Sequence, residues 1–124
     1  MGLFKKSTKK QGVEAILQED PASESGLTKD AEEAVTLMAM KMSFKGLALA
    51  MKHPSPKVRK YVVSLIGMAG NIKSGPDGSV MVGFTADEKL VGPGAAQAIR
   101  LLKAAAKDPD ASVSSSAQAI LDEQ

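Results

Sequence analysis

Apolar residues recur at helical spacing through most of this chain. Asp30 and Glu33 are spaced as a capping box, and no strong stop follows before the prolines at 54 and 56, so the pattern predicts one helix over 31–52. Gly46 marks a kink or a break within it. The same spacing predicts helices over 57–69, 94–107 and 112–122, and a shorter one over 11–19.

The predicted helix over 31–52 is apolar on two sides. At about 100° per residue, one strip contains Leu37, Met40, Phe44, Leu47, Ala48 and Met51, and a second contains Val35, Met38, Met42 and Leu49. Lys41, Lys45 and Lys52 fall together between the strips. A helix that is apolar on two sides needs a cover on both. We therefore expect Met38, Met42 and Leu49 to form an apolar contact with a partner.

Residues 71–93 depart from the helical pattern. "GPDG" is typical of a turn, and the alternation in "SVMVGFT" predicts a short strand with Val80, Val82 and Phe84 on one face. This segment of more than twenty residues without a helical pattern is longer than an ordinary connection between two helices. Because loops often carry recognition, these three residues are a further candidate binding surface.

Two segments of the chain, 51–67 and 106–122, share a pattern of proline and apolar residues. A shift of 55 positions aligns the two segments and pairs Pro54 with Pro109, Val58 with Val113, Val62 with Ala117, Leu65 with Ile120, Ile66 with Leu121, and Met51 with Ala106. Upstream of the segments, the same shift pairs Phe44 with Ile99 and Leu47 with Leu102. Each segment belongs to a unit of helix, short proline turn and helix. A helical hairpin repeated at fixed spacing predicts an all-α fold in which the two hairpins stack.

The repeated phrases also resemble a known family. "KHPSPKVRKYVVSLIG" and "KDPDASVSSSAQAIL" are similar to the turn and second helix of HEAT-like repeats, above all the short bacterial and archaeal kind also seen in phycobilisome lyases, where the turn reads Asp-Pro-x-x-x-Val-Arg. His53 stands where the family prefers Asp, and Ser114 where it prefers Arg.

The resemblance implies a short α-solenoid of antiparallel helical hairpins, with units at about 40–70 and 94–122 and an irregular insertion at 71–93. It implies a binding scaffold rather than a catalyst, and a structural role for an arginine at position 59. We expect two parts in the chain: residues 1–29 as a basic tail, short helix and linker, and residues 30–124 as the helical domain.

Charge is distributed unevenly, although the 124 residues carry a formal net charge of only +2. No acidic residue lies between Glu33 and Asp77, and this interval contains a candidate basic patch of Lys41, Lys45, Lys52, Lys57, Arg59 and Lys60. Unneutralised cations near the start of a helix oppose its dipole. The patch is therefore either a set of solvated and structural side chains or a site for an acidic partner.

The sequence offers no recognisable catalytic chemistry. It has no cysteine, one histidine (His53) in a proline turn, and no phosphate-binding or nucleophile motif. We predict no enzyme activity, no metal and no cofactor. The absence of cysteine fits a reducing cytoplasm, and the start "MGLFKKSTKK" suits contact with an anionic membrane at its periphery.

These observations favour a non-enzymatic protein–protein interaction module, an accessory or adaptor subunit of a larger complex. The expected partner is a larger protein or complex with an acidic surface, or a second copy of the chain. The alternative is binding of nucleic acid or an anionic membrane through the Lys-rich tail and the 41–60 basic patch. Nucleic acid ranks lower because the whole chain carries a formal net charge of only +2.

Overall fold

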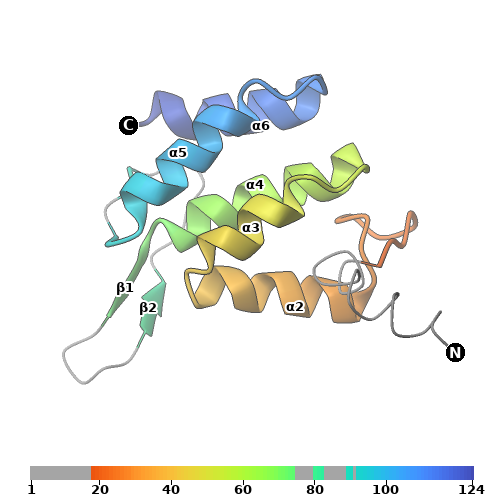
Figure 1. Ribbon diagram of the computed structural model, residues 1–124, viewed down its shortest axis with the longest axis horizontal. Helices are drawn as coiled ribbons and strands as arrows, with labels where there is room; N and C mark the ends of the chain where they lie inside the picture. Colours follow the sequence, from red (N-terminus) through yellow and green to blue (C-terminus); the bar gives the residue numbers. More distant parts are fainter. Residues whose placement is uncertain (1–17, 75–79, 83–88, 91) are drawn as a thin grey trace, which may run out of the picture.

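The computed structural model describes residues 18–74, 80–82, 89–90 and 92–124 (Figure 1). Along this part of the chain the elements are α2 (Lys29–Met40), α3 (Phe44–Ala50), α4 (Pro56–Ala69), β1 (Ile72–Ser74), β2 (Val80–Val82), α5 (Ala95–Ala105) and α6 (Ala111–Asp122). The fold is all-α apart from the short hairpin. The helices predicted over 57–69, 94–107 and 112–122 are confirmed as α4, α5 and α6, with ends within two residues. The helix predicted over 11–19 falls mostly outside the described residues.

The prediction of one continuous helix over 31–52 is wrong. Helix α2 ends at Met40 because Met42 adopts a left-handed conformation, with φ of 54°. The amides of Met42 and Ser43 then donate to the carbonyls of Ala39 (3.0 Å) and Met38 (2.8 Å), which is the Schellman pattern of helix termination. Glycine usually occupies that left-handed position, so methionine gave no sequence signal.

The start of the same helix also differs from the prediction. The side chain of Thr28, rather than Asp30, is the N-cap of α2, and its Oγ1 accepts a hydrogen bond from the amide of Ala31 (3.2 Å). Gly46 breaks no helix and lies inside α3. A Cβ there would stand 3.0 Å from Sδ of Met38, so Gly46 lets α3 approach α2 closely.

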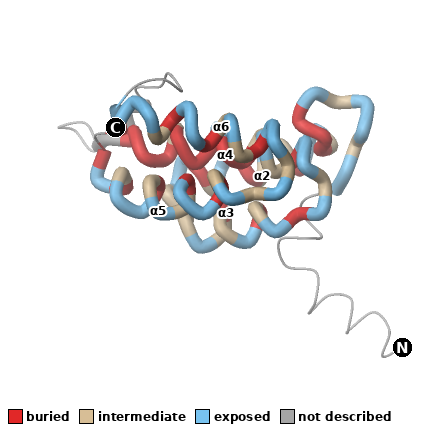
Figure 2. The backbone as a smooth tube through the Cα atoms, turned by 90° about the horizontal axis from the view of Figure 1, so that it is seen from above, coloured by how far each residue is buried: buried red, intermediate tan, exposed pale blue. Residues whose placement is uncertain are grey.

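The helices form two layers. Helix α4 packs between α2 and α6, and α5 packs against α4 and α6. Figure 2 shows α4 and α6 along one side of the molecule and α3 and α5 along the other. The pairs α3–α4 and α5–α6 are thus two hairpins placed side by side in the same order, as the repeated sequence pattern predicts.

The core occupies the space between the two layers. Three of the residue pairs related by the 55-residue shift are fully buried on both members: Leu47 and Leu102, Val58 and Val113, Val62 and Ala117. Val63 and Ile66 of α4 are also fully buried, since α4 is covered by helices on several sides. The repeated apolar positions therefore fill one continuous core shared by both hairpins.

The insertion leaves α4 and returns to α5 through a short hairpin. β1 pairs with β2 in antiparallel register, with Ile72 opposite Val82 and Ser74 opposite Val80. The chain comes back beside the end of α4, where the amide of Gly92 donates to the carbonyl of Gly70 (2.9 Å). A Cβ at Gly92 would lie 2.6 Å from the carbonyl oxygen of Ile72, so this close approach of two backbones requires glycine.

The segment 18–28 packs onto the start of α4. Leu27 is fully buried in the core, and Nζ of Lys57 donates to the carbonyl of Pro21 (3.1 Å). Gly26 has φ of 78°, and its Cα approaches so closely that an added Cβ would lie 3.2 Å from Val58. Residues 18–28 thus belong to the same packed body as the helices that follow.

Helix α6 begins with a charged cap whose strength depends on pH. The carboxylate of Asp110 accepts hydrogen bonds from the hydroxyl and amide of Ser112 and the amide of Val113, and these bonds hold the pKa of Asp110 below its ordinary value of 3.8. Because the pKa is lower in the folded state, this stabilisation is complete above pH 3.8 and is lost as the pH falls through the folded-state pKa.

We expect the melting temperature of Asp110→Asn to depend less on pH between 5 and 2 than that of the unaltered chain, as measured by circular dichroism. Equal pH dependence in the two proteins would contradict the cap.

Candidate binding surface

An ion pair joins the proline turns of the two hairpins. Nε and Nη2 of Arg59 donate to the two carboxylate oxygens of Asp108, over 2.9 and 3.1 Å. Nη1 of Arg59 donates to the carbonyls of His53 (2.9 Å) and Pro54 (3.0 Å). The side chains of Arg59 and Asp108 are only 14% and 9% exposed. Arg59, one of the predicted partner-binding residues, therefore has its guanidinium engaged within the molecule.

The equivalent positions at the two ends of the stack hold other residues. His53 occupies in the first turn the place of Asp108 in the second, and its Nδ1 accepts from the amide of Ser55 (3.1 Å) and lies 3.7 Å from Glu19 Oε1. Ser114 occupies the place of Arg59, and its hydroxyl donates to the carbonyl of Ala111 (3.2 Å). Neither His53 nor Ser114 can form a carboxylate–guanidinium pair with a further repeat, so this type of pairing is confined to the junction between the two hairpins.

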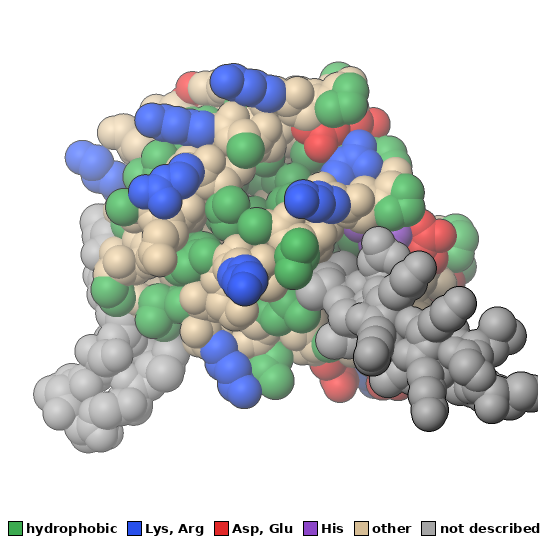
Figure 3. All heavy atoms as spheres, viewed as in Figure 1, with side chains coloured by type: hydrophobic (Ala, Val, Ile, Leu, Met, Phe, Trp, Pro, Cys, Tyr) green, Lys and Arg blue, Asp and Glu red, His purple; other side chains and the backbone are tan. Residues whose placement is uncertain are grey.

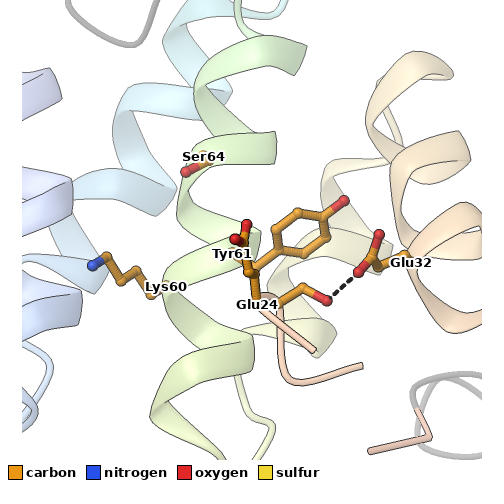
Figure 4. Close-up of a pocket in the computed structure, with 6 residues that line it drawn as sticks. Glu24, Glu32, Lys60, Tyr61 and Ser64 are labelled. Carbon is orange, nitrogen blue, oxygen red and sulfur yellow. Dashed lines mark hydrogen bonds between the residues drawn. The ribbon is translucent and has the colours of Figure 1, made fainter. Parts of the chain in front are cut away.

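Lys57 and Lys60 lie near the start of α4, next to acidic residues of the N-terminal part. Lys60 is exposed and lines a shallow pocket together with Glu24, Ser25, Glu32, Tyr61 and Ser64. Figure 4 shows Lys60 pointing away from Tyr61 and Glu32, while Glu32 accepts the hydroxyl of Ser25 (2.5 Å). Lys57 and Lys60 thus belong to α4, whereas Lys45 belongs to α3 and Lys52 to the turn between the two helices.

A second basic surface is formed by α3, α5 and the turn that follows each of them. We call it the cationic face, and it consists of the exposed side chains of Lys45, Lys52, Arg100, Lys103 and Lys107. Neither α3 nor α5 contains an acidic residue. Figure 3 shows Lys and Arg side chains spread over this side of the molecule, with apolar side chains between them and acidic ones at its edges. Lys41 is exposed in the turn that precedes α3.

Sequence reasoning missed three members of the cationic face, Arg100, Lys103 and Lys107. The signal that finds two of them is the repeat itself, because a shift of 55 positions pairs Lys45 with Arg100 and Lys52 with Lys107. Equivalent positions of stacked repeats lie side by side on the same face. The two hairpins therefore present cations at matching places.

A shallow apolar groove runs between α3 and α5. It has a volume of about 270 Å³, and its lining consists of Ala48, Met51, Lys52, Leu101, Ala104, Ala105 and Asp108. Leu49, on α3, is 45% exposed. The groove is mostly aliphatic, and its charged lining residues are Lys52 of the cationic face and Asp108, whose carboxylate is held by Arg59. This combination suits a ligand with an apolar ridge flanked by negative charge.

The apolar surface differs from the prediction at most of its residues. Leu49 is exposed as expected, whereas Met38 and Met42 are half-buried, and Met38 packs against the core. The exposed side chains of α2 are instead Leu37 (48%) and Met40 (45%). The cause is the break at 41–43, which gives α3 its own rotation, so the positions of the two helices no longer lie on common strips.

The other predicted site residues add no further chemistry. Val80 and Val82 lie in β2, and Phe84 is outside the described residues. Within the described ranges, no group of three His, Cys, Asp or Glu side chains is placed to hold a metal ion. In the same part of the chain, no helix has the length and apolar character needed to cross a bilayer.

We compared the chain with protein-family models, with curated proteins and with solved structures, and none of these comparisons gave a match. Its function is therefore inferred from its own surfaces. Of these, the cationic face with its groove is the one that both repeats build together.

Proposed function

We propose that this chain is a non-enzymatic binding module, an accessory subunit that holds an acidic surface of a larger protein against the cationic face. The observation that carries the proposal is the charge on this side of the molecule: five exposed cations lie on α3, α5 and the turns that follow them, neither helix contains an acidic residue, and one of the five, Lys52, lines an apolar groove. Complementary charge accelerates association and fixes orientation, while the apolar groove supplies contact area.

We further propose that the scaffold is a two-repeat stack of the HEAT-like type. Two observations support this. The hairpins α3–α4 and α5–α6 share one core with equivalent residues buried at equivalent places. In addition, Arg59, near the start of α4, binds Asp108 in the turn between α5 and α6, at the two positions where the family motif has Arg and Asp.

A protein partner suits this surface better than a nucleic acid does. Among the described residues, the large apolar side chains with high exposure are Leu37, Met40 and Leu49, and none of them is aromatic. Proteins that bind single-stranded nucleic acid usually stack bases on aromatic side chains. Phosphate groups, moreover, would gain nothing from the aliphatic groove beside the lysines.

The test is a pull-down with two matched charge variants. The first is Lys45→Glu with Lys103→Glu on the cationic face, and the second is Lys57→Glu with Lys60→Glu at the start of α4. Both variants change the formal net charge by the same amount, so any effect of overall charge on partner binding is the same in the two. We expect the first variant to recover the partner roughly tenfold less, equal to about 1.4 kcal/mol of binding free energy, and the second to recover it nearly unchanged.

The same pull-down separates the partner classes. A protein that co-elutes at physiological salt after nuclease treatment supports the proposal. A bound fraction that disappears with nuclease would assign the surface to nucleic acid instead. Loss of the partner in the Lys57/Lys60 variant alone would move the site to α4 and contradict the role of the cationic face.

A further inference from the structure

Helix α2 forms one end of the helical stack and exposes apolar side chains there. Figure 1 shows α2 at one end and α6 at the other, with α4 between them. One side of α2 is buried and packs against α3 and α4. Its exposed side carries Leu37 and Met40, which are 48% and 45% exposed. They belong to a shallow groove of about 370 Å³ whose lining is Glu32, Glu33, Thr36, Leu37 and Met40. We call this surface the α2 face.

The opposite end of the stack is polar. The exposed residues of α6 are small or polar, namely Ala111, Ser112, Ser115, Gln118, Ala119 and Asp122. In the part of the chain that the structure describes, the large apolar side chains with high exposure are Leu37 and Met40 on α2 and Leu49 on α3. The terminal units of a solenoid normally present a polar outer surface. Helix α6 fits that rule and α2 does not, so only one end of the stack has apolar surface left to cover.

The charges on the α2 face are complementary to those of a second α2 helix. Glu33 and Lys41 are both exposed, and they stand four residues before and four residues after Leu37. At about 1.5 Å per residue, each lies about 6 Å from Leu37 along the helix axis. A second α2 that runs antiparallel, with its Leu37 beside the first, therefore brings Lys41 level with Glu33 at both ends of the contact. The same register places Met40 level with Ala34, whose small side chain leaves room for it.

A surface that complements itself in this way forms a two-fold symmetric contact. Such a contact closes at two copies, because each copy uses its own patch once. Growth into a filament would need a second adhesive end, and the exposed residues of α6 offer no large apolar side chain for one. The order of acid, apolar residue and base along α2 thus fits a second copy of the chain, in a dimer and not in a longer array.

We propose that two copies of this chain associate end to end through α2. The two helices run antiparallel, the Leu37 side chains meet at the two-fold axis, and each Glu33 faces Lys41 of the other copy. This contact uses none of the residues of the cationic face, so each copy brings its own cationic face to the dimer. Because each copy contributes a single helix, the interface is small, and we expect a dimer that dissociates in the micromolar range.

Sedimentation velocity of the full chain, from low micromolar to near millimolar concentration, measures the dissociation constant of this dimer. We expect Leu37→Ser to raise the constant by at least roughly tenfold, because it removes the apolar side chain at the centre of the contact. The matched control is Leu49→Ser, since Leu49 is almost equally exposed but lies on α3. We expect the control to change the constant by less than about twofold.

A charge swap tests the antiparallel register. Glu33→Lys or Lys41→Glu alone places like charges opposite each other at both ends of the contact, and we expect each variant to dimerise roughly tenfold more weakly. An equimolar mixture of the two variants restores two opposite-charge pairs, so we expect it to form a mixed dimer nearly as strong as the original one. Glu123→Lys makes the same change in net charge as Glu33→Lys at the polar end of the stack, and it should leave the dissociation constant unchanged.

Three results would overturn the proposal. A chain that sediments as a monomer at every concentration would show that the occupant of the α2 face is not a second copy. Equal weakening by Leu37→Ser and Leu49→Ser would show that the contact does not lie on α2. A mixture of Glu33→Lys and Lys41→Glu that dimerises no more strongly than either variant alone would show that Glu33 and Lys41 do not face each other.

Discussion

Replacing Asp108 by asparagine is expected to lower the free energy of unfolding by about 3 kcal/mol. The side chain of Arg59 is 14% exposed, and its guanidinium is held by both carboxylate oxygens of Asp108 at the junction of the two hairpins. An asparagine would leave that cation partly buried without its counter-charge, which is more costly than never having formed the pair. We expect a fall in melting temperature of roughly 10 °C and a lower urea midpoint, both measured by circular dichroism.

Two further variants show whether the loss comes from the ion pair. Glu123→Gln removes an exposed charge at the end of α6 and is expected to change stability by less than about 0.5 kcal/mol. The double variant Arg59→Met with Asp108→Leu removes both charges and is expected to be more stable than Asp108→Asn, because no unpaired ion remains. A double variant as unstable as the sum of its single variants would show that Arg59 and Asp108 are not coupled.

Leu47→Ala and Leu102→Ala are expected to destabilise the protein by about 3 kcal/mol each. Both leucines are fully buried and occupy equivalent positions of the two hairpins, on α3 and α5. Each substitution removes apolar contact and leaves a cavity that the layered helices can only partly close. Urea unfolding monitored by circular dichroism gives both values on the same scale.

The matched control for this pair is Leu49→Ala. Leu49 is 45% exposed on the same helix as Leu47, so its truncation is expected to cost less than about 0.5 kcal/mol. A small loss at Leu102 with a large loss at Leu47 would show that α5 contributes little to the core. The two hairpins would then not be energetically equivalent, and the stacked-repeat description would be wrong.

The repeated pattern of the sequence predicted much of this fold. Prolines at equivalent positions located both turns, and helical spacing located α4, α5 and α6, because the apolar residues of these helices pack into a single shared core. The register of the repeat also pairs Leu47 with Leu102, and both are fully buried.

The break between α2 and α3 could not be predicted in the same way. Met42 takes a left-handed conformation that methionine seldom adopts, so local propensity gives no sign of it. Once the helix is broken, the assignment of Met38 and Met42 to the surface fails, and Leu37 and Met40 take their place. A single turn residue thus changed the expected apolar surface.

The candidate site was predicted only in part. The absence of acidic residues over 34–76 indicated a basic surface, but proximity in sequence grouped Lys57, Arg59 and Lys60 with the lysines of α3. The fold separates these residues, because the proline turn directs α4 into the other layer. It joins Lys45 and Lys52 instead to cations 55 residues away, which only the stacking of the hairpins brings together.

The central claim is that a partner covers the cationic face, and lysine footprinting of the isolated complex tests it most directly. Free chain and complex are acetylated briefly at the same pH, and the extent of modification at each lysine is read by mass spectrometry. The account predicts that Lys45, Lys52, Lys103 and Lys107 lose reactivity in the complex, while Lys57 and Lys60 keep theirs. Protection of Lys57 and Lys60 with full reactivity on α3 and α5 would contradict it.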